Sequence, residues 1–279
     1  MSLRYIIDAF KTKQVLDKSY KRYAEPFAMD NWWGEYDEEY DRDLVARTLD
    51  AFDKAREKHF ELIHQSDYRD TYRSRDFTPT HYLKHYRTFE AKYSRSTILK
   101  RNLLRRTLAK KPFVLAYRLQ SLGIPTITNA FYAAEHGHYI PRNALYVSIE
   151  APGSLPLDFF LRSLGNFSNA GSYTERFNPR LPEIPMPLLM ETFGKFCKQV
   201  VEAGVRIFYK EMIANTLVRV TDGSPACLLC DLDIIGAISP LSRPEREERL
   251  REIGRDLERR VKRYGLTPEI EAYYRGALG

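Results

Sequence analysis

Residues 204–235 read GVRIFYKEMIANTLVRVTDGSPACLLCDLDII, and this stretch decides the fold. A helix is expected to end at Gly204, and a loop then leads to Asn215 and a β-branched strand, TLVRV. Residues 222–225, DGSP, predict a tight turn. The second strand, CLLCDLD, then carries Asp231 and Asp233 to its far end. The stretch is therefore predicted to be a β-hairpin that begins with an amide and ends with carboxylates.

Oxygen ligands from two neighbouring backbone segments are what a Mg²⁺-nucleotide site needs. The hairpin would supply an amide oxygen before its first strand and carboxylate oxygens after its second. Many hairpins end in aspartate, so a purely structural turn is the alternative interpretation. The remaining sequence is needed to choose between a metal site and a structural turn.

The composition favours an anionic partner and a reducing compartment. The 279 residues allow one large domain or two lobes, and the formal net charge is +7. This charge suggests a nucleotide, a phosphorylated glycan, a membrane surface or a nucleic acid. Three cysteines, the lack of a long apolar run and a start unlike a signal peptide favour a cytoplasmic protein.

Two short motifs have the spacing of metal ligands. Cys227-x-x-Cys230 lies on a predicted strand, where positions i and i+3 point to opposite faces, so we expect buried and inert thiols. His136-Gly137-His138 lies between two predicted strands without further ligands nearby in sequence. We expect no metal at either motif.

The first 59 residues are predicted to be an N-terminal helical extension. Residues 1–24 have the pattern of an amphipathic helix, which either packs on the domain or rests on an anionic membrane. Residues 29–43, MDNWWGEYDEEYDRD, are expected to form a loop in which Asp43 or a neighbour caps the helix of residues 44–60.

The middle of the chain has the pattern of strands interrupted by a helix. FELIHQS, DTYRSRDF and THYLKHYR predict a three-stranded antiparallel meander over residues 60–87, with Lys84 in its third strand. Residues 94–122 are helical in pattern, and Pro112 is expected to begin a second helix there. NAFYAAE and ALYVSIE, residues 129–135 and 144–150, predict two more strands.

A basic segment accompanies this predicted helix. Nine Lys or Arg residues and no Asp or Glu occur between Ala91 and Ala134. A solvated helix face usually mixes both signs, so a phosphate-rich partner is the natural counter-charge.

The remainder is predicted to be mainly helical. LDFFLRSLG follows a break at residues 151–154, and a loop spans residues 166–187. Pro187 begins the predicted core helix, which ends at Gly204. Residues 243–265 carry one apolar stripe among dense mixed charge.

This order of elements resembles the protein-kinase-like fold, and more narrowly the bacterial lipopolysaccharide core kinases that act on Kdo and heptose, the heptose kinase most of all. The resemblance is carried by residues 60–87, by LQSLGIPTITNAFYAAE, by YVSIEAPGSLPL as the hinge, by FCKQVVEAGVRIFYKEMIANTLV as the helix and catalytic loop, and by CLLCDLD. It implies an α+β class with a small antiparallel sheet lobe, residues 60–153, and a reduced, mainly helical lobe, residues 154–279.

The resemblance implies ATP and Mg²⁺ as cofactors and assigns roles to residues. Lys84 matches the lysine that contacts the nucleotide phosphates, while Asn215 and Asp231 match the two metal ligands. The hinge, Ile149, Glu150, Ala151 and Pro152, would meet the adenine with backbone groups. The implied partner is a lipopolysaccharide core or another phosphorylated glycan at the cytoplasmic face of the inner membrane.

Three departures from the family pattern bear on activity. No glycine occurs between Gly34 and Gly123, where a phosphate-covering loop is expected, and the predicted helix has no glutamate to partner the lysine. The catalytic-loop aspartate is replaced by Lys210, which leaves Glu211 or Asp233 as the candidate base, with Lys210 neutralising phosphate.

Two interpretations therefore remain, with a third as an outside possibility. The first is an ATP-dependent sugar kinase of the lipopolysaccharide inner core. The second is a pseudokinase that binds nucleotide, an anionic glycan, a membrane or a partner protein. Nucleic-acid binding through the basic segment has no recognisable motif behind it, so no nucleic acid is expected.

Overall fold

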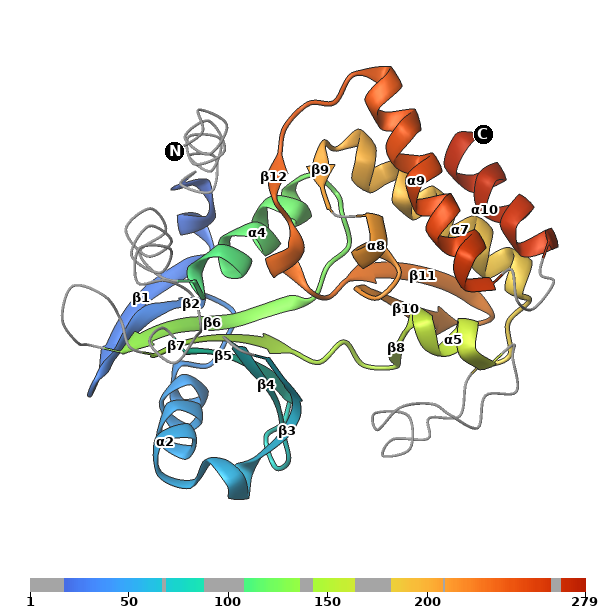
Figure 1. The fold of residues 1–279 in the computed structure, drawn as a ribbon. Coiled ribbons are helices and arrows are strands. Elements are labelled where there is room, and N and C mark those ends of the chain that lie inside the picture. The colour runs from blue at the N-terminus through green and yellow to red at the C-terminus, as the bar shows by residue number, and fades with distance from the viewer. Residues whose placement is uncertain are drawn as a thin grey trace. The chain divides into compact units, whose positions relative to one another are not determined.

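The computed structural model describes residues 18–66, 69–87, 108–135, 143–163, 182–207, 209–261 and 267–279. The chain divides into two compact units. Unit 1 comprises residues 1–121 and 127–151, and unit 2 comprises residues 122–126 and 152–279. The fold class is α+β with antiparallel sheets, as predicted, and each unit is described by itself (Figure 1).

Unit 1 is built on a seven-stranded antiparallel sheet with the order β1-β2-β6-β7-β5-β4-β3. Its strands are β1 (Ala24–Met29), β2 (Trp32–Asp37), β3 (Phe60–Gln65), β4 (Arg69–Ser74), β5 (His81–Arg87), β6 (Thr128–Glu135) and β7 (Asn143–Ile149). Its helical elements are η2 (Lys18–Arg22), α2 (Arg42–His59) and α4 (Lys110–Ser121).

The strand order confirms the predicted three-stranded meander and the two strands predicted at residues 129–135 and 144–150. Strands β3, β4 and β5 follow one another across the sheet, and β7 then pairs with β5 so that β6 lies beyond it. Helix α4 precedes β6 in the chain, so this part of unit 1 has the order expected of a protein-kinase-like sheet with one intervening helix. Pro112 lies in the first turn of α4, where a missing N–H costs no hydrogen bond.

The N-terminal region differs from the prediction of a helix followed by a loop. Residues 24–37 form the β1–β2 hairpin, and β2 pairs with β6 at the edge of the meander sheet. Trp32, Gly34 and Tyr36 are buried while the residues between them are half-buried, which is the period-2 pattern of a strand. The cap of α2 is Asp41, whose carboxylate accepts the N–H of Asp43 at 2.8 Å.

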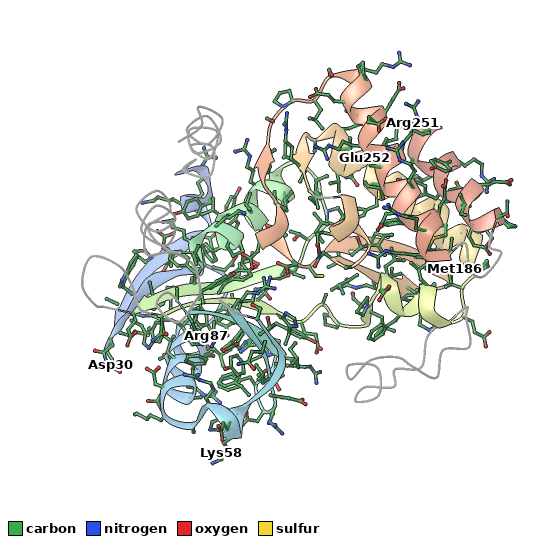
Figure 2. The ribbon with its side chains drawn as sticks, in the orientation of Figure 1. Asp30, Lys58, Arg87, Met186, Arg251 and Glu252 are labelled. Atoms are coloured by element: carbon green, nitrogen blue, oxygen red, sulfur yellow. The ribbon has the colours of Figure 1, made fainter. Side chains whose placement is uncertain are left out.

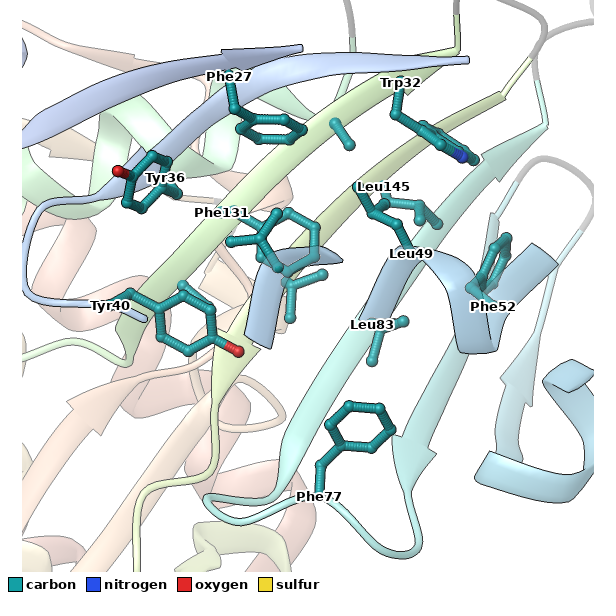
Figure 3. Packing of buried hydrophobic residues seen from close by; sticks show 14 of the residues in the cluster. Phe27, Trp32, Tyr36, Tyr40, Leu49, Phe52, Phe77, Leu83, Phe131 and Leu145 are labelled. Carbon is teal, nitrogen blue, oxygen red and sulfur yellow. The ribbon is translucent and has the colours of Figure 1, made fainter. Parts of the chain in front are cut away.

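Helix α2 covers one face of the sheet. Phe52 lies among the rings of Trp32, Phe60 and Tyr72, and Leu83 of β5 is fully buried beside them (Figure 3). Fully burying an aromatic or leucine side chain stabilises a fold by about 1.5–3 kcal/mol, so this aromatic cluster is the main apolar core of unit 1.

Helix α4 contacts β6 and β7 from the other face. Phe113 lies edge-on to Tyr132 with ring centroids 5.1 Å apart. The Lys110 ammonium, 3.1 Å from a carboxylate oxygen of Glu35 on β2, ties the start of the helix to the sheet. Because a cation at a helix N-terminus opposes the helix dipole, this ion pair compensates an otherwise unfavourable charge.

Unit 2 is mainly helical. Its helices are α5 (Leu157–Ser163), α7 (Met186–Glu202), α8 (Tyr209–Met212), α9 (Arg243–Val261) and α10 (Thr267–Leu278), together with the short turn η3 (Leu232–Ile234). Gly194 and Gly276 let α7 and α10 approach closely, because a Cβ at either position would meet the backbone of the other helix. Helix α9 carries interleaved charges, among them Arg251 and Glu252 (Figure 2).

Two small sheets complete unit 2. Strand β10 (Thr216–Thr221) lies between β11 (Ser224–Leu229) and β8 (Ser154–Pro156), and β9 (Val205–Arg206) pairs with β12 (Ala237–Ile238). The predicted core helix and hairpin are thus confirmed as α7 and β10–β11. Helix α7 contacts β11, so the hairpin rests on the core helix.

Several sequence predictions fall outside the described residues. These are most of the N-terminal amphipathic segment, six of the nine bases of the basic segment, the His136-Gly137-His138 motif and most of the loop of residues 166–187. Among the helices of the described residues, none combines the length and the apolar character needed to span a bilayer.

The buried His81 predicts a pH dependence of stability. Its Nε2 is 2.7 Å from the Tyr40 hydroxyl, the side chain is fully buried, and burial lowers its pKa to about 4. Between pH 6.5 and about 4 the unfolded chain binds a proton at this site that the native chain does not. Stability therefore falls as the pH drops through this window, by at most roughly 3 kcal/mol.

Urea unfolding at pH 7 and pH 4.5 measures this loss for the wild type and for His81→Asn. We expect a smaller loss in the variant than in the wild type, with the remainder due to other groups such as His85, whose pKa burial also lowers. An equal loss in both proteins would show that His81 does not carry the effect.

Candidate functional site

The β10–β11 hairpin brings two segments of residues 204–235 side by side, one at Asn215 and the other at Cys230. Thr216 pairs with Leu229 at the open end of the ladder, and the turn at Asp222–Gly223 uses left-handed backbone angles at both residues. One more backbone bond follows the ladder, since the Cys230 N–H donates to the Asn215 carbonyl at 3.0 Å. Asn215 therefore lies opposite Cys230, with Asp231 as the next residue.

Asn215 is held by the helical turn that precedes it. Its backbone N–H donates to the Glu211 carbonyl at 3.0 Å, and its side-chain Nδ2 donates to the same carbonyl at 2.8 Å. Nδ2 also lies 3.3 Å from Glu211 Oε2. Because Nδ2 is engaged on this side, the amide is oriented by its neighbour in α8, and its Oδ1 is the atom that remains for a ligand.

Asp231 lies in a different local structure from the predicted one. Strand β11 ends at Leu229, and Asp231 instead caps η3 by accepting the Asp233 N–H at 3.2 Å. An aspartate competes with strand pairing by bonding to backbone groups two residues on, so the ladder stops here. Asp231 and Asp233 consequently belong to one tight turn rather than to the end of a strand.

The loop between β9 and β10 is closed at its base by short backbone pairing. The Gly236 N–H donates to the Arg206 carbonyl, and the Ser239 N–H donates to the Gly204 carbonyl, both at 2.9 Å. Gly204 has φ +74°, and a Cβ there would meet the Ser239 backbone, so only glycine fits. The backbone of Lys210 lies in α8, directly before Glu211.

Lys84 lies in unit 1 on the face of the sheet that α4 covers. It pairs with Thr71 on β4 and with Tyr146 on β7, and its residue is only 8% exposed. Its Nζ lies 5.9 Å from the centroid of the Tyr146 ring. We call the side chains of Arg73, Tyr82, Lys84 and Tyr146, which alternate onto this side of β4, β5 and β7, the lysine face.

The predicted hinge begins at the end of β7, beside the lysine face. The Glu150 carboxylate accepts from Arg73 Nη2 at 3.0 Å and from the Tyr82 hydroxyl at 3.2 Å. The Glu150 N–H donates to the Thr80 carbonyl at 2.8 Å. Because that N–H is engaged, any contact of Glu150 with a base falls to its carbonyl oxygen or its carboxylate, while Ile149 still belongs to the sheet.

The donor set at the hairpin fits Mg²⁺ better than a transition metal. Mg²⁺ is usually held by one or two carboxylates together with water and substrate phosphates. Asn215 Oδ1 and the Asp231 carboxylate are oxygen atoms of this kind, one on each side of the open end of the hairpin. In the described part of the chain, no group of three or more His, Cys, Asp or Glu residues could hold a metal by itself.

The structure thus brings together Asn215, Asp231 and Asp233 with Glu211 and the backbone of Lys210 in unit 2. Lys84 and the hinge residues Ile149, Glu150 and Ala151 belong to unit 1. The sequence analysis did not find Tyr146, Asn129 or the Glu35–Lys110 pair, since each depends on strand register. The only available signal was a polar Asn129 at the start of an apolar strand.

No protein-family model matches the chain, and no curated protein matches its sequence. Solved structures align with it at low identity. "WaaP in complex with acyl carrier protein" is 16% identical with a TM-score of 0.42, over 76% of this chain and 87% of that one. Rio2 kinase from Chaetomium thermophilum, with ADP, Mg²⁺ and phosphoaspartate, is 16% identical with a TM-score of 0.47, over 96% and 76%.

A microcompartment-associated aminopropanol kinase is 13% identical with a TM-score of 0.35, over 84% of this chain and 85% of that one. These identities and TM-scores are low, so the likenesses carry no argument about activity or substrate.

The cysteines of unit 2 predict a pattern of thiol reactivity. Burial raises the pKa of Cys227 to about 12 and that of Cys197 well above its usual range, while Cys230 is half-buried. Because the thiolate is the reactive form, an aromatic disulfide reagent at pH 8 should modify at most one thiol in the native protein. All three should react in guanidinium chloride.

Cys230→Ser is the matched control and should abolish the native reaction. The expectation of buried, inert thiols therefore holds for Cys227 and is wrong for the burial of Cys230, which is half-buried. Two or more thiols that react at similar rates in the native protein would contradict the burial of Cys197 and Cys227.

Proposed function

We propose that this chain is an ATP-dependent phosphotransferase whose acceptor is a sugar of the lipopolysaccharide inner core, heptose or Kdo. The observation that carries the proposal is the backbone pairing of Asn215 with Cys230, the residue directly before Asp231. The substrate class rests on the sequence resemblance to the core heptose kinases.

The metal and phosphate roles are those that the sequence resemblance implies. Asn215 and Asp231 would hold Mg²⁺, which when bound supplies charge neutralisation for the β- and γ-phosphates. Lys84 would contact phosphate oxygens from unit 1, and the hinge at residues 149–151 would meet the base. Most catalysis of phosphoryl transfer is positioning and charge stabilisation, which this set of residues can provide.

Glu211 is the best placed candidate for the general base. Its carboxylate lies against the Asn215 amide, one turn before the hairpin, whereas Lys210 has no acceptor for a proton while it is charged. In the proposed step the acceptor hydroxyl oxygen bonds to the γ-phosphorus and the bond to the leaving ADP oxygen breaks. The hydroxyl proton passes to the Glu211 carboxylate.

The acceptor would already be anionic, because core sugars carry phosphates or Kdo carboxylates. The net charge of +7 and the run of nine bases without an acid between Ala91 and Ala134 support such a partner. The same charge supports a peripheral position at an anionic membrane face.

A second candidate is a pseudokinase that binds nucleotide or an anionic glycan without turnover. Lys210 stands in α8 at the position of the catalytic-loop aspartate, and this substitution favours it. Both candidates share the metal and nucleotide residues, so they differ only in phosphate transfer.

Asp231→Asn tests the metal assignment. Removing one charge from a carboxylate ligand should weaken Mg²⁺-dependent ATP binding by at least tenfold, by analogy with loss of a charged contact worth about 1.5–3 kcal/mol. Isothermal calorimetry with and without Mg²⁺ measures it. Asp222→Asn, at the far end of the same hairpin, is the matched control, and unaltered binding in Asp231→Asn would show that the assignment is wrong.

Glu211→Gln separates the two candidate functions. If Glu211 is the base, turnover with a core-oligosaccharide acceptor should fall by roughly 10²–10⁴-fold while ATP affinity changes little. Release of ADP in the presence of acceptor measures it. Full retained turnover would remove Glu211 as the base, and no turnover in the wild type despite Mg²⁺-ATP binding would favour the pseudokinase.

A further inference from the structure

We propose that Arg206 and Ser239 of unit 2 form a binding site for a phosphate group, separate from the proposed Mg²⁺-nucleotide site. The ligand is the phosphate of a monoester, such as a phosphorylated sugar, or free inorganic phosphate. The inference goes beyond the proposed function, because it needs neither nucleotide binding nor turnover.

The short sheet of β9 and β12 brings the two residues to one face (Figure 1). Val205 pairs with Ile238, and both of these side chains are buried. The Ser239 N–H donates to the Gly204 carbonyl at 2.9 Å, so the pairing continues by one residue beyond β12. Because side chains alternate along a strand, Arg206 and Ser239 both take the face opposite Val205 and Ile238.

Each of the two side chains has a buried polar atom whose hydrogen bond is not made. Arg206 Nε and Ser239 Oγ are shielded from solvent, and neither has a hydrogen-bond partner among the described residues. Each residue as a whole is only half-buried, so a solute can reach the side chain. A polar atom buried in this way costs free energy until it gains a partner. The two atoms therefore indicate a ligand that bonds to both.

The Arg206 charge has an anionic neighbour but no direct ion pair with the residues that the structure describes. Glu245 Oε2 accepts the N–H and the hydroxyl of Ser242, both at 2.8 Å, which holds this carboxylate at the start of α9. The pKa of Glu245 is lowered chiefly by these bonds from Ser242, and in part by the charge of Arg206. The guanidinium is therefore left to contact an anion from solution, with Glu245 opposing that anion.

A tetrahedral anion matches these groups better than a carboxylate does. The guanidinium can hold two oxygens of either anion through parallel N–H bonds. A phosphate group adds oxygens outside the plane of that contact, and these can accept from the Ser239 hydroxyl. Diagonal neighbours across a strand pair are about 7–8 Å apart, which a phosphate and the long arginine side chain can bridge. The second negative charge of a phosphate monoester also offsets the repulsion from Glu245.

The test is isothermal calorimetry of the full chain with inorganic phosphate, glucose 1-phosphate and acetate, without Mg²⁺ and at constant ionic strength. The variants are Arg206→Gln, Ser239→Ala and Glu245→Gln, of which the last keeps a residue that can cap α9. Arg219→Gln is the matched control. Arg219 is an exposed arginine of β10 in the same unit, and its Nε already lies 3.4 Å from the Ser154 hydroxyl.

We expect both phosphates to bind to the wild type, and acetate to bind more weakly by roughly tenfold. Arg206→Gln should weaken phosphate binding by roughly tenfold or more, and Ser239→Ala by roughly 2- to 10-fold. Glu245→Gln should strengthen it by roughly 2- to 10-fold, because a repelling charge is removed. Arg219→Gln should bind phosphate as the wild type does.

Thermal unfolding gives a second readout that a merely structural arginine would not produce. Because Arg206 makes no ion pair with the described residues, Arg206→Gln should have the same Tm as the wild type, or a higher one, in chloride buffer. Phosphate at equal ionic strength should then raise the Tm of the wild type alone. If Arg206→Gln does not fold, the opposite effects expected for Ser239→Ala and Glu245→Gln decide.

The inference is overturned if the wild type binds no phosphate, or binds phosphate and acetate equally. It is also overturned if Arg206→Gln binds as the wild type does, or loses no more than Arg219→Gln. Binding of inorganic phosphate alone would identify free phosphate as the ligand, and binding of glucose 1-phosphate as well would identify a monoester. Asp231→Asn should leave phosphate binding unchanged, so a failure of the proposed metal site is distinguishable from a failure of this one.

Discussion

A single backbone hydrogen bond, from the Cys230 N–H to the Asn215 carbonyl, fixes Asn215 opposite the residue that precedes Asp231, and our proposed metal site depends on it. It continues the β10–β11 ladder by one residue and brings the backbone of Asn215 beside that of Cys230, from two separate chain segments. The surrounding elements serve this geometry. Helix α7 packs against strand β11 of the hairpin. The pairing of β9 with β12 closes the loop that carries Glu211.

The electrostatics of unit 1 follow from a helix that has bases but no acids. Glu35 of the sheet compensates Lys110 of the helix, so the ion pair between α4 and the sheet has its carboxylate on the strand. The buried ammonium of Lys84 lies over an aromatic ring. The Lys110–Glu35 pair satisfies the rule that a buried charge needs a partner, without an acidic residue on α4.

The sequence predicted those parts of the fold in which local pattern and burial agree. Alternation in residues 60–87 and the apolar spacing of α7 identified the meander and the core helix, because side-chain period and burial point the same way. The hairpin was found because its turn residues and β-branched strand are local signals.

Other parts depend on contacts between distant residues and could not be predicted in this way. Residues 29–43 were expected to be a loop because their acidic content hid the alternation of Trp32, Gly34 and Tyr36, which pairing with β6 makes a strand. The end of β11 was placed too late, since the capping preference of Asp231 competes with the ladder. The shared face of Arg206 and Ser239 could be found only from register.

The most direct measurement of the central claim is a crystal structure of the full chain with Mn²⁺ and a non-hydrolysable ATP analogue. The anomalous scattering of Mn²⁺ locates a metal without reference to the protein. Our account predicts a peak in contact with Asn215 Oδ1 and the Asp231 carboxylate. The account would be contradicted if the nucleotide bound with its metal away from Asn215 and Asp231. It would also be contradicted if no nucleotide bound at a saturating concentration.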